Sequence, residues 1–183
     1  MEAIQKVILV DENDQETGFA EKIEAHEKGW LHRAFSVFIF NSRGEMLLQR
    51  RADTKYHSPG LWTNACCSHP SPGEEIQDAA SRRMMEEMGF DTALEKIFSF
   101  IYKASFNNGL TEYEFDHVLA GTYDGSVNFN PEEVREIAFK DCSVIQEDIE
   151  KQPEMFSAWF KLAFPKVVRW WRIRYQGMEP NEL

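Results

Sequence analysis

Residues 68–90 read SHPSPGEEIQDAASRRMMEEMGF, a short loop followed by a helix rich in acidic residues. Prolines and a glycine near the start predict the loop. From Glu74 to Met88 the apolar side chains recur at three- and four-residue steps, which indicates an amphipathic helix. Gly89 is expected to end this helix, because glycine adopts the left-handed conformation of a C-terminal cap without strain. The segment therefore predicts a loop–helix unit that carries a cluster of carboxylates.

On both sides of this unit the patterns favour strands. Ala34–Phe40 is almost wholly apolar, as a buried strand should be, and the turn Asn41–Gly44 joins it to a second strand, Glu45–Arg50, in a predicted hairpin. Asn130 opens a predicted short helix, since a capping Asn is followed by Pro131 and two acids. The other predicted elements are strands at Lys6–Val10, Leu94–Ala104, Glu112–Tyr123 and Phe139–Cys142, a short segment at Trp62–Cys67, and a helical tail from Pro153 to about Tyr175. Strands and helices mix without regular alternation, so we expect an α+β, or mixed α/β, fold.

Length and composition limit the class of protein. The chain has 183 residues, 43% of them hydrophobic and 28% charged, so we expect a single globular domain over residues 1–183. The net charge of −11 disfavours general nucleic-acid binding, although a local basic patch could hold a small anion. No apolar run approaches a membrane span or a secretory signal, and three cysteines, two of them adjacent, form no disulfide pattern. These features predict a cytoplasmic protein that binds neither nucleic acid nor membrane.

Histidines and alternating acids form a candidate metal site. In the segment Glu112–Asp116 the acids alternate with aromatics, so a strand would place Glu112, Glu114 and Asp116 on one face. Alternation alone favours a solvated acidic face with the aromatics buried. Neighbouring carboxylates repel one another unless a cation lies between them, however, and three imidazoles with two carboxylates would suit an octahedral Mn, Zn or Fe site. The residues that would supply this site are His26, His32, His69, Glu112 and Glu114. Their spacing leaves open whether they converge.

The loop–helix unit resembles the Nudix box, whose pattern is G-x5-E-x7-R-E-U-x-E-E-x-G-U with U aliphatic. The matching residues are Glu74, Arg82, Glu86, Glu87 and Gly89, with Met84 and Phe90 at apolar positions. In such a unit the carboxylates gather divalent cations that bridge a diphosphate, and oxygen ligands suit Mg²⁺. The alternative is an ordinary acidic helix with its glutamates in solvent.

Two departures from the box bear on the activity. Ser68 replaces the first glycine, and Arg83 stands where the hydrolases use a metal-binding glutamate. Arg83 lies four residues before Glu87, so the two side chains share a helix face. They either pair with each other or leave the arginine as a diphosphate clamp. The box therefore predicts diphosphate binding more firmly than diphosphate hydrolysis.

The flanking segments resemble the type I isopentenyl diphosphate isomerases, which are Nudix-fold proteins. Thr63–Pro70 is similar to their T-N-x-x-C-x-H-P motif, and Glu112–Glu114 is similar to their E-x-E motif. The stretch Leu47–Trp62 and the C-terminal Phe156–Trp159 are also similar to segments of that family. The likeness covers about residues 7–171 and implies a Nudix-like fold with β-sheets sandwiched by helices.

The resemblance implies an activity and a role for several residues. It implies conversion of isopentenyl diphosphate, a small-molecule substrate, to dimethylallyl diphosphate by a monomer or weak homodimer. The implied catalytic residues are Cys67, Tyr102, Glu114 and Trp159. The implied diphosphate contacts are Lys22, Arg51, Lys55 and Arg83, with Glu87 holding Mg²⁺ against the diphosphate. The implied ligands of a Mn²⁺ or Zn²⁺ ion are His26, His32, His69, Glu112 and Glu114.

This chemistry explains the residue types. Moving a double bond by one carbon needs a proton added at one carbon and another removed two carbons away, through a tertiary carbocation. Cys67 and Glu114 would be the two proton-transfer groups, although the sequence leaves open which one protonates. Tyr102 would polarise the carboxylate, and the π-face of Trp159 would lie near the cation. Water must be excluded, because it would capture the cation as an alcohol.

Several of these residues also have a plainer interpretation. A lone cysteine such as Cys67 is more often a buried small hydrophobe, and Trp159 is as readily core packing for the C-terminal helix. Cys66 is expected to pack, and His57 and His117 are expected to be structural or exposed. Cys142 is likewise assigned to packing. For the protein as a whole, the alternatives are a Nudix hydrolase of nucleoside diphosphate derivatives and a catalytically idle Nudix-like binding module.

Overall fold

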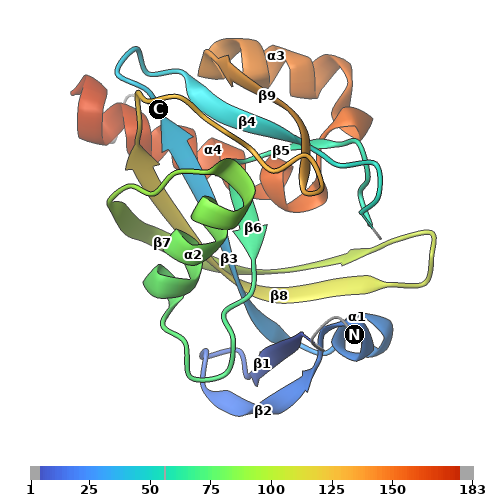
Figure 1. Cartoon of the computed structure of the whole chain (residues 1–183). Helices are drawn as coiled ribbons and strands as arrows, with labels where there is room; N and C mark the ends of the chain where they lie inside the picture. The colour runs from blue at the N-terminus through green and yellow to red at the C-terminus, as the bar shows by residue number, and fades with distance from the viewer. Residues whose placement is uncertain (1–4, 56, 178–183) are drawn as a thin grey trace.

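The computed structural model describes residues 5–55 and 57–177. The predicted domain, residues 1–183, also includes positions that lie outside the described residues. Within them the chain forms a mixed α+β fold (Figure 1). No helix in this part of the chain is long and apolar enough to cross a membrane. The strands are β1 (Lys6–Val10), β2 (Glu16–Glu21), β3 (His32–Phe40), β4 (Met46–Arg51), β5 (Trp62–Thr63), β6 (Cys66–Ser68), β7 (Leu94–Ser105), β8 (Thr111–Thr122) and β9 (Val134–Lys140). The helices are α1 (Lys22–Lys28), α2 (Ile76–Met88), α3 (Cys142–Lys151), the 3₁₀ turn η1 (Pro153–Met155) and α4 (Ala158–Gln176).

Strand β3 is the centre of the mixed sheet. It pairs in parallel with β8 along its whole length and antiparallel with β1, β4 and β6. Beyond β8 the sheet continues into β7 through a long antiparallel hairpin, while β9 pairs with β4 and β2 pairs with β1. The β3–β8 pair joins segments that are far apart in the sequence. The position of every side chain on β8 therefore depends on a long-range pairing.

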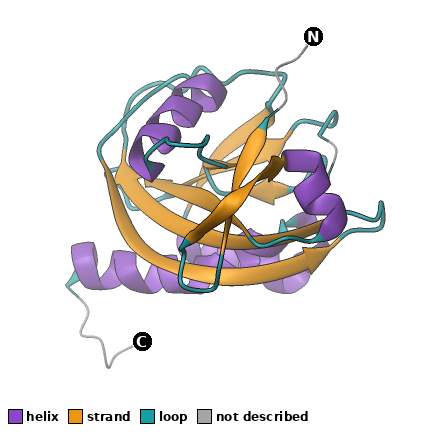
Figure 2. Cartoon of the chain, turned by 90° about the horizontal axis from the view of Figure 1, so that it is seen from below, coloured by secondary structure: helices purple, strands orange, loops and turns teal. Residues whose placement is uncertain are grey.

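The two faces of the sheet pack against different helices, which Figure 2 shows on either side of the strands. Because side chains alternate along β3, Phe35, Val37 and Ile39 pack in the core beneath α2. Phe38 and Phe40 point the other way and pack in the core beneath α4. The sheet is therefore covered by helices on both sides, as the resemblance implied.

The segment around residues 130–142 differs from the prediction. The residues after Asn130 form a turn, not a short helix, and β9 begins directly after this turn at Val134. The Asn130 side chain does accept a hydrogen bond from the backbone N–H of Glu132 at 3.0 Å, but pairing along β4 draws the following residues into a strand. The strand predicted at Phe139–Cys142 is the end of β9, and Cys142 begins α3.

Local signals predicted α2, whereas α1 and α3 were not predicted from the sequence. Helix α2 begins two residues later than predicted and ends at Gly89, which has the expected left-handed conformation with φ 72°. Helix α1 is only seven residues long and follows a strand directly, so its periodicity is too short to detect. Helix α3 does carry a signal, since Asp141 caps it by accepting a hydrogen bond from the backbone N–H of Ser143 at 2.7 Å.

Candidate active site and metal centre

The site lies on the α4 side of the sheet. On this face the first halves of β3 and β8 carry polar side chains, and the second halves carry apolar ones that pack against α4. Strand register sets the geometry, because Glu114 of β8 lies between His32 of β3 and Tyr102 of β7. Ser36 of β3 lies opposite Cys67 of β6. The sheet thereby brings the cysteine motif and the E-x-E motif onto one surface.

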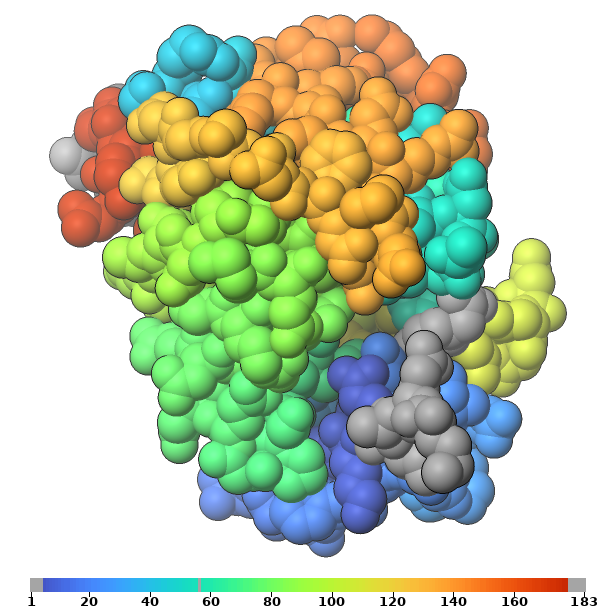
Figure 3. All heavy atoms as spheres, viewed as in Figure 1, coloured from blue at the N-terminus to red at the C-terminus, as the bar shows by residue number. Residues whose placement is uncertain are grey.

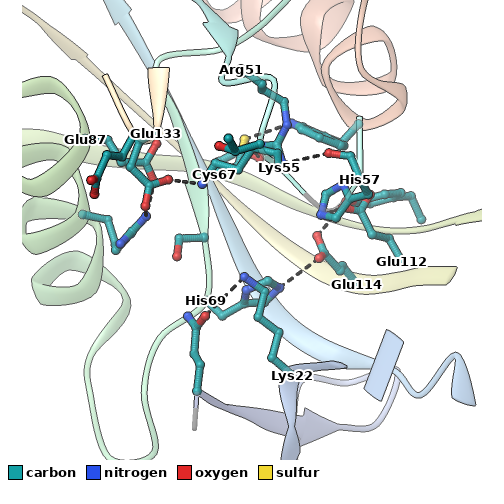
Figure 4. Close-up of a pocket in the computed structure, with 18 residues that line it drawn as sticks. Lys22, Arg51, Lys55, His57, Cys67, His69, Glu87, Glu112, Glu114 and Glu133 are labelled. Atoms are coloured by element: carbon teal, nitrogen blue, oxygen red, sulfur yellow. Dashed lines mark hydrogen bonds and ion pairs between the residues drawn. The ribbon is translucent and has the colours of Figure 1, made fainter. Parts of the chain in front are cut away.

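These side chains line a pocket of about 460 Å³. Figure 3 shows the surface hollowed between the green helix α2, the orange segment that leads into β9 and the blue N-terminal strands. In Figure 4 cationic and acidic side chains from different elements point into this space. Two predicted metal ligands, His26 and His32, lie next to the pocket beside Glu114. The predicted site residues in its walls are Lys22, Arg51, Lys55, Cys67, His69, Arg83, Glu87, Tyr102, Glu112, Glu114 and Trp159.

Four of the five predicted metal ligands converge on one point. The Nε2 atoms of His69, His32 and His26 lie 3.0, 3.5 and 4.0 Å from Oε1 of Glu114. Ligand atoms of these four buried residues all lie within 4.8 Å of one another. Imidazole nitrogens with a carboxylate oxygen are the donor set that Zn²⁺ and similar ions prefer.

Backbone contacts orient two of these imidazoles. Nδ1 of His26 lies 2.6 Å from the carbonyl oxygen of Lys22, and Nδ1 of His32 lies 2.8 Å from that of Trp30. Because a carbonyl oxygen only accepts, Nδ1 carries the proton in each ring and Nε2 keeps its lone pair. Nε2 of His32 is buried and has no hydrogen-bond partner within the described residues. Rings held in this way are typical of metal-binding histidines, so the residues present fit a divalent cation.

The fifth predicted ligand, Glu112, belongs to an adjacent group. Its ligand atom lies within 4.8 Å of those of His26 and His57, and its Oε1 is 3.3 Å from Nε2 of His57. His57 was predicted to be structural or exposed. Its side chain is only 7% exposed, and it lines the pocket. The signal available in the sequence was its position two residues after Lys55, in a loop that the resemblance predicts to contact the diphosphate.

Burial keeps the imidazoles neutral, and the pKa values of the two glutamates shift in opposite directions. It lowers the pKa of His69 to about 3 and that of His57 to about 2, so both rings are neutral at pH 7 and able to bind a metal ion. Burial also raises the pKa of Glu112 well above its ordinary value. At Glu114 the effect of burial is outweighed by the imidazoles of His32 and His69 beside it, which hold the pKa of this carboxyl well below its ordinary value.

The acidic face of β8 is buried, contrary to the solvated face that alternation alone favoured. Glu112, Glu114 and Asp116 are each 6% exposed or less. Oη of Tyr102 lies 2.6 Å from Oε2 of Glu114 and 3.1 Å from Oε2 of Glu112. Asp116 accepts a hydrogen bond from Oγ of Ser36 at 2.8 Å, and burial raises the pKa of this aspartate to about 8. Tertiary packing thus places the carboxylates inside.

Positive charge is concentrated at the pocket. Lys22 begins α1, Arg51 ends β4, Lys55 lies in the loop after β4, and Arg83 lies on α2. Burial, reinforced by the positive charges of Lys55 and Arg83, lowers the pKa of Lys22 to about 8. Lys55 and Arg83 also form ion pairs with Glu133. In a chain of net charge −11 such a cluster indicates an anion-binding pocket.

The acids of α2 divide into a buried and an exposed set. Glu87 is 4% exposed and faces the pocket, with Oε1 2.5 Å from Nη2 of Arg83. Glu86 is exposed and pairs with Arg82 at 3.3 Å. Arg82 also contacts both carboxylate oxygens of Glu74, at 2.7 and 2.8 Å, which ties the loop to the helix. The alternative of a helix with its glutamates in solvent therefore describes Glu86 but not Glu87. Arg83 pairs with Glu87, as their four-residue spacing allows.

Cys67 lies within a network of hydrogen bonds. Its thiol donates to Oδ1 of Asn64 at 3.0 Å, and its sulfur accepts from Nε1 of Trp159 at 2.9 Å. Oγ of Ser36 lies 3.6 Å from the sulfur. Burial raises the pKa of the thiol, so Cys67 is protonated at neutral pH. The neighbouring Cys66 points to the opposite face and packs fully buried in the core beneath α2.

Asn64 is a site residue to which sequence reasoning assigned no role. Its amide nitrogen donates to the carbonyl oxygens of Val37 and Cys66 at 3.0 and 2.8 Å, which fixes the orientation of the side chain. Its Oδ1 consequently faces Cys67 and Trp159. The available signal was the place of this asparagine within the cysteine motif.

Comparisons with known proteins show which family and fold the chain is similar to. The NUDIX domain family matches residues 30–160. Isopentenyl-diphosphate Delta-isomerase 2 of Aromatoleum aromaticum is 50% identical over 163 residues, which cover 89% of this chain and 86% of that protein. The isopentenyl-diphosphate Delta-isomerase of Pectobacterium atrosepticum is 49% identical over 169 residues, which cover 92% of this chain and 94% of that protein. Among solved structures, a Deinococcus radiodurans protein is similar with a TM-score of 0.67 at 20% identity, over 80% of this chain and 90% of that one. At such low identity the structural likeness concerns the fold alone.

Proposed function

The chain belongs to the isopentenyl-diphosphate Delta-isomerases and contains a NUDIX domain, and we propose on that basis that its pocket converts isopentenyl diphosphate to dimethylallyl diphosphate. It is an enzyme, an isomerase that moves a carbon–carbon double bond. The observation that carries the proposal is the meeting of Cys67 and Glu114, from strands on two sides of β3, in one pocket lined by cations. A site that only hydrolysed a diphosphate would not need this pair of proton-transfer groups.

The diphosphate is assigned to four cations of the pocket. Lys55 and Arg83 are ion-paired with Glu133, so an incoming diphosphate would compete with this carboxylate for both side chains. Arg83 would then turn away from Glu87, and Glu87 would hold Mg²⁺ together with diphosphate oxygens. The residues assigned to the diphosphate are Lys22, Arg51, Lys55 and Arg83.

The two proton-transfer groups differ in protonation. Cys67 is a thiol and Glu114 is a carboxylate, so the simplest assignment makes Cys67 the acid and Glu114 the base. Proton donation leaves a thiolate, which the N–H of Trp159 at 2.9 Å stabilises. The indole of Trp159 also lies beside the developing cation, a contact worth about 0.5–2 kcal/mol. The hydroxyl of Tyr102, 2.6 Å from Glu114, holds the carboxylate in place.

A Mn²⁺ or Zn²⁺ ion, when bound, would supply positive charge that offsets the buried carboxylates of this region. The chain's own residues prepare its site, because His26 and His32 are oriented through backbone carbonyls before any ion binds. The residues proposed to hold this ion are His26, His32, His69, Glu112 and Glu114.

The hydrolase alternative has less support. Arg83 occupies the position of a metal-binding glutamate, and Glu86 is exposed and paired with Arg82. A catalytically idle module is also disfavoured, because it would need neither Cys67 nor the hydrogen-bonded Tyr102. We further propose a cytoplasmic enzyme that is a monomer or weak homodimer and binds a small-molecule substrate but neither nucleic acid nor membrane. The free thiols of Cys66, Cys67 and Cys142 are compatible with a reducing compartment.

Product analysis in D₂O tests the proposed function. Purified protein given isopentenyl diphosphate should form dimethylallyl diphosphate that carries deuterium, since the added proton comes from an exchangeable group. Treatment with EDTA should slow the reaction strongly, and Mg²⁺ with Mn²⁺ or Zn²⁺ should restore it. Release of inorganic phosphate without any isomer would refute the isomerase in favour of a hydrolase.

A further inference from the structure

We propose that His57 is a ligand of the metal centre, so that this chain offers the ion six residues and not the five that the family resemblance implies. The inference deepens the proposed function and rests on it for the presence of a metal ion. Its structural basis is the pair of donor groups beside the pocket. The first group contains His26, His32, His69 and Glu114, and the second contains His26, His57 and Glu112.

The two groups form one continuous set of donors. His26 belongs to both of them, and every member is buried. The centroid of its ring lies 4.9 Å from that of His32 and 6.0 Å from that of His57. Together the two groups hold four imidazole nitrogens and two carboxylate oxygens, which is the number of donors that an octahedral site takes, and the structure brings four of these six to one point. The structure therefore contains one more imidazole than the predicted site requires.

Glu112 gives the second reason to include His57. Glu112 is the one predicted ligand outside the first group, and its Oε1 lies 3.3 Å from Nε2 of His57 (Figure 4). An ion that Glu112 binds through Oε1 would therefore also lie close to Nε2 of His57. A metal centre that uses the E-x-E motif in full would include this ring.

Packing alone does not explain an imidazole at this position. The ring of His57 stacks on Phe106 at 5.1 Å and meets Trp159 edge-on at 6.0 Å. A phenyl ring could make both contacts, so what histidine adds is its nitrogen atoms, placed against a buried carboxylate. A phenylalanine substitution therefore separates ligation from packing.

His57 would also connect the metal to the substrate loop. It lies in the loop between β4 and β5, which also contains Lys55, and its carbonyl oxygen accepts a hydrogen bond from Nη2 of Arg51 at 3.2 Å. A metal-bound His57 would hold in place two residues that are proposed to bind the diphosphate. Metal binding and diphosphate binding would then support each other.

The histidine content of the chain permits a direct test. There are five histidines, and His117 lies outside both groups with Nε2 3.0 Å from Asp14. We would label the imidazoles with ¹⁵N, remove metal with a chelator, titrate with Zn²⁺ and follow the ring nitrogens by NMR. The signals of four histidines, His57 included, should move to metal-bound positions while that of His117 stays in place. A His57 signal that does not move at saturation overturns the proposal.

Substitution provides the second measurement. His57→Phe should weaken Zn²⁺ binding, measured by chelator competition, by more than about 10-fold. The matched control is His117→Gln, which also removes a buried histidine beside a carboxylate and should leave the Zn²⁺ affinity unchanged. Wild-type affinity in His57→Phe, or an equal loss in both variants, would contradict the proposal. The NMR titration needs no variant, so it decides the matter even if His57→Phe fails to fold. Both readouts are independent of turnover, so a wild-type protein that binds Zn²⁺ through His57 without isomerising would refute the proposed function alone.

Discussion

Cys67→Ser should abolish most of the activity while leaving the fold and the metal content intact. The substitution replaces the thiol by a hydroxyl of similar size, which can keep the hydrogen bonds with Asn64 and Trp159. The new hydroxyl can donate to Oδ1 of Asn64, which lies 3.0 Å from the sulfur, and can accept from Nε1 of Trp159, which lies 2.9 Å from it. What changes is the acidity, because an alcohol has a far higher pKa than a thiol.

The expected loss follows from the role of a positioned acid. Such a group contributes about 10²–10⁴-fold to a rate, which corresponds to about 3–5 kcal/mol in the activation barrier. We therefore expect kcat to fall by about 10²–10⁴-fold in Cys67→Ser, with KM little changed because the diphosphate contacts remain. The assay is the initial rate of dimethylallyl diphosphate formation, measured together with the melting temperature and the bound metal.

Cys66 supplies the internal control. Its side chain is fully buried in the core beneath α2 and points away from the pocket. Cys66→Ser replaces this buried thiol, whose hydrogen-bond partner is the carboxylate of Glu87, by a hydroxyl. The change costs at most about 1–3 kcal/mol, which for a chain of this size lowers the melting temperature by at most about 2–12 °C. Its kcat should stay close to that of the wild type. Equal kcat values for Cys66→Ser and Cys67→Ser would refute the assignment of the chemistry to Cys67.

Three further predictions concern binding, the backbone and pH. Arg51→Ala and Lys55→Ala should each raise KM by about 10–100-fold and change kcat less, because the charge of the diphosphate stays constant during isomerisation and each lost contact is worth about 1.5–3 kcal/mol. Steady-state kinetics will decide this, and a large loss of kcat at constant KM in both variants would mean that these residues act elsewhere. Gly89→Ala should lower the free energy of unfolding by at least about 1–2 kcal/mol, since residue 89 has φ 72° and a Cβ there would collide with the carbonyl oxygen of Asn128. Urea unfolding measures this loss, and unchanged stability would show that the turn relaxes freely. Burial lowers the pKa of His117 from 6.5 to about 4, so between these pH values the imidazole is protonated in the unfolded chain but not in the folded chain. The free energy of unfolding should therefore fall as the pH drops from 6.5 to 4. His117→Gln should make this decline shallower, and an identical pH profile in both proteins would count against the assignment.

The sequence determined the elements whose signals are local. Strand β1 has the predicted bounds Lys6–Val10, and α2 begins two residues later than predicted and ends where expected before Gly89. These predictions succeed because hydrophobic spacing and a capping glycine act within a few residues of themselves. The same locality fixed the opposite directions of Cys66 and Cys67, because neighbouring residues in a strand face opposite sides.

Only the tertiary structure decided which face of β8 is buried and which side chains its polar residues contact. The acids of β8 alternate with aromatics, and this pattern by itself favoured an acidic face turned outward. Pairing with β3 and β7 turned it inward, beside His32 and Tyr102. Pairing along β4 likewise converted the predicted helix after Asn130 into a turn and a strand. The position of His57 near Lys55 could have indicated the pocket, but its contact with Glu112, on a distant strand, appears only in the structure. The sequence shows which side chains are present, but contacts between distant segments depend on the register of the strand pairs. That register is set only when the whole sheet packs against its helices.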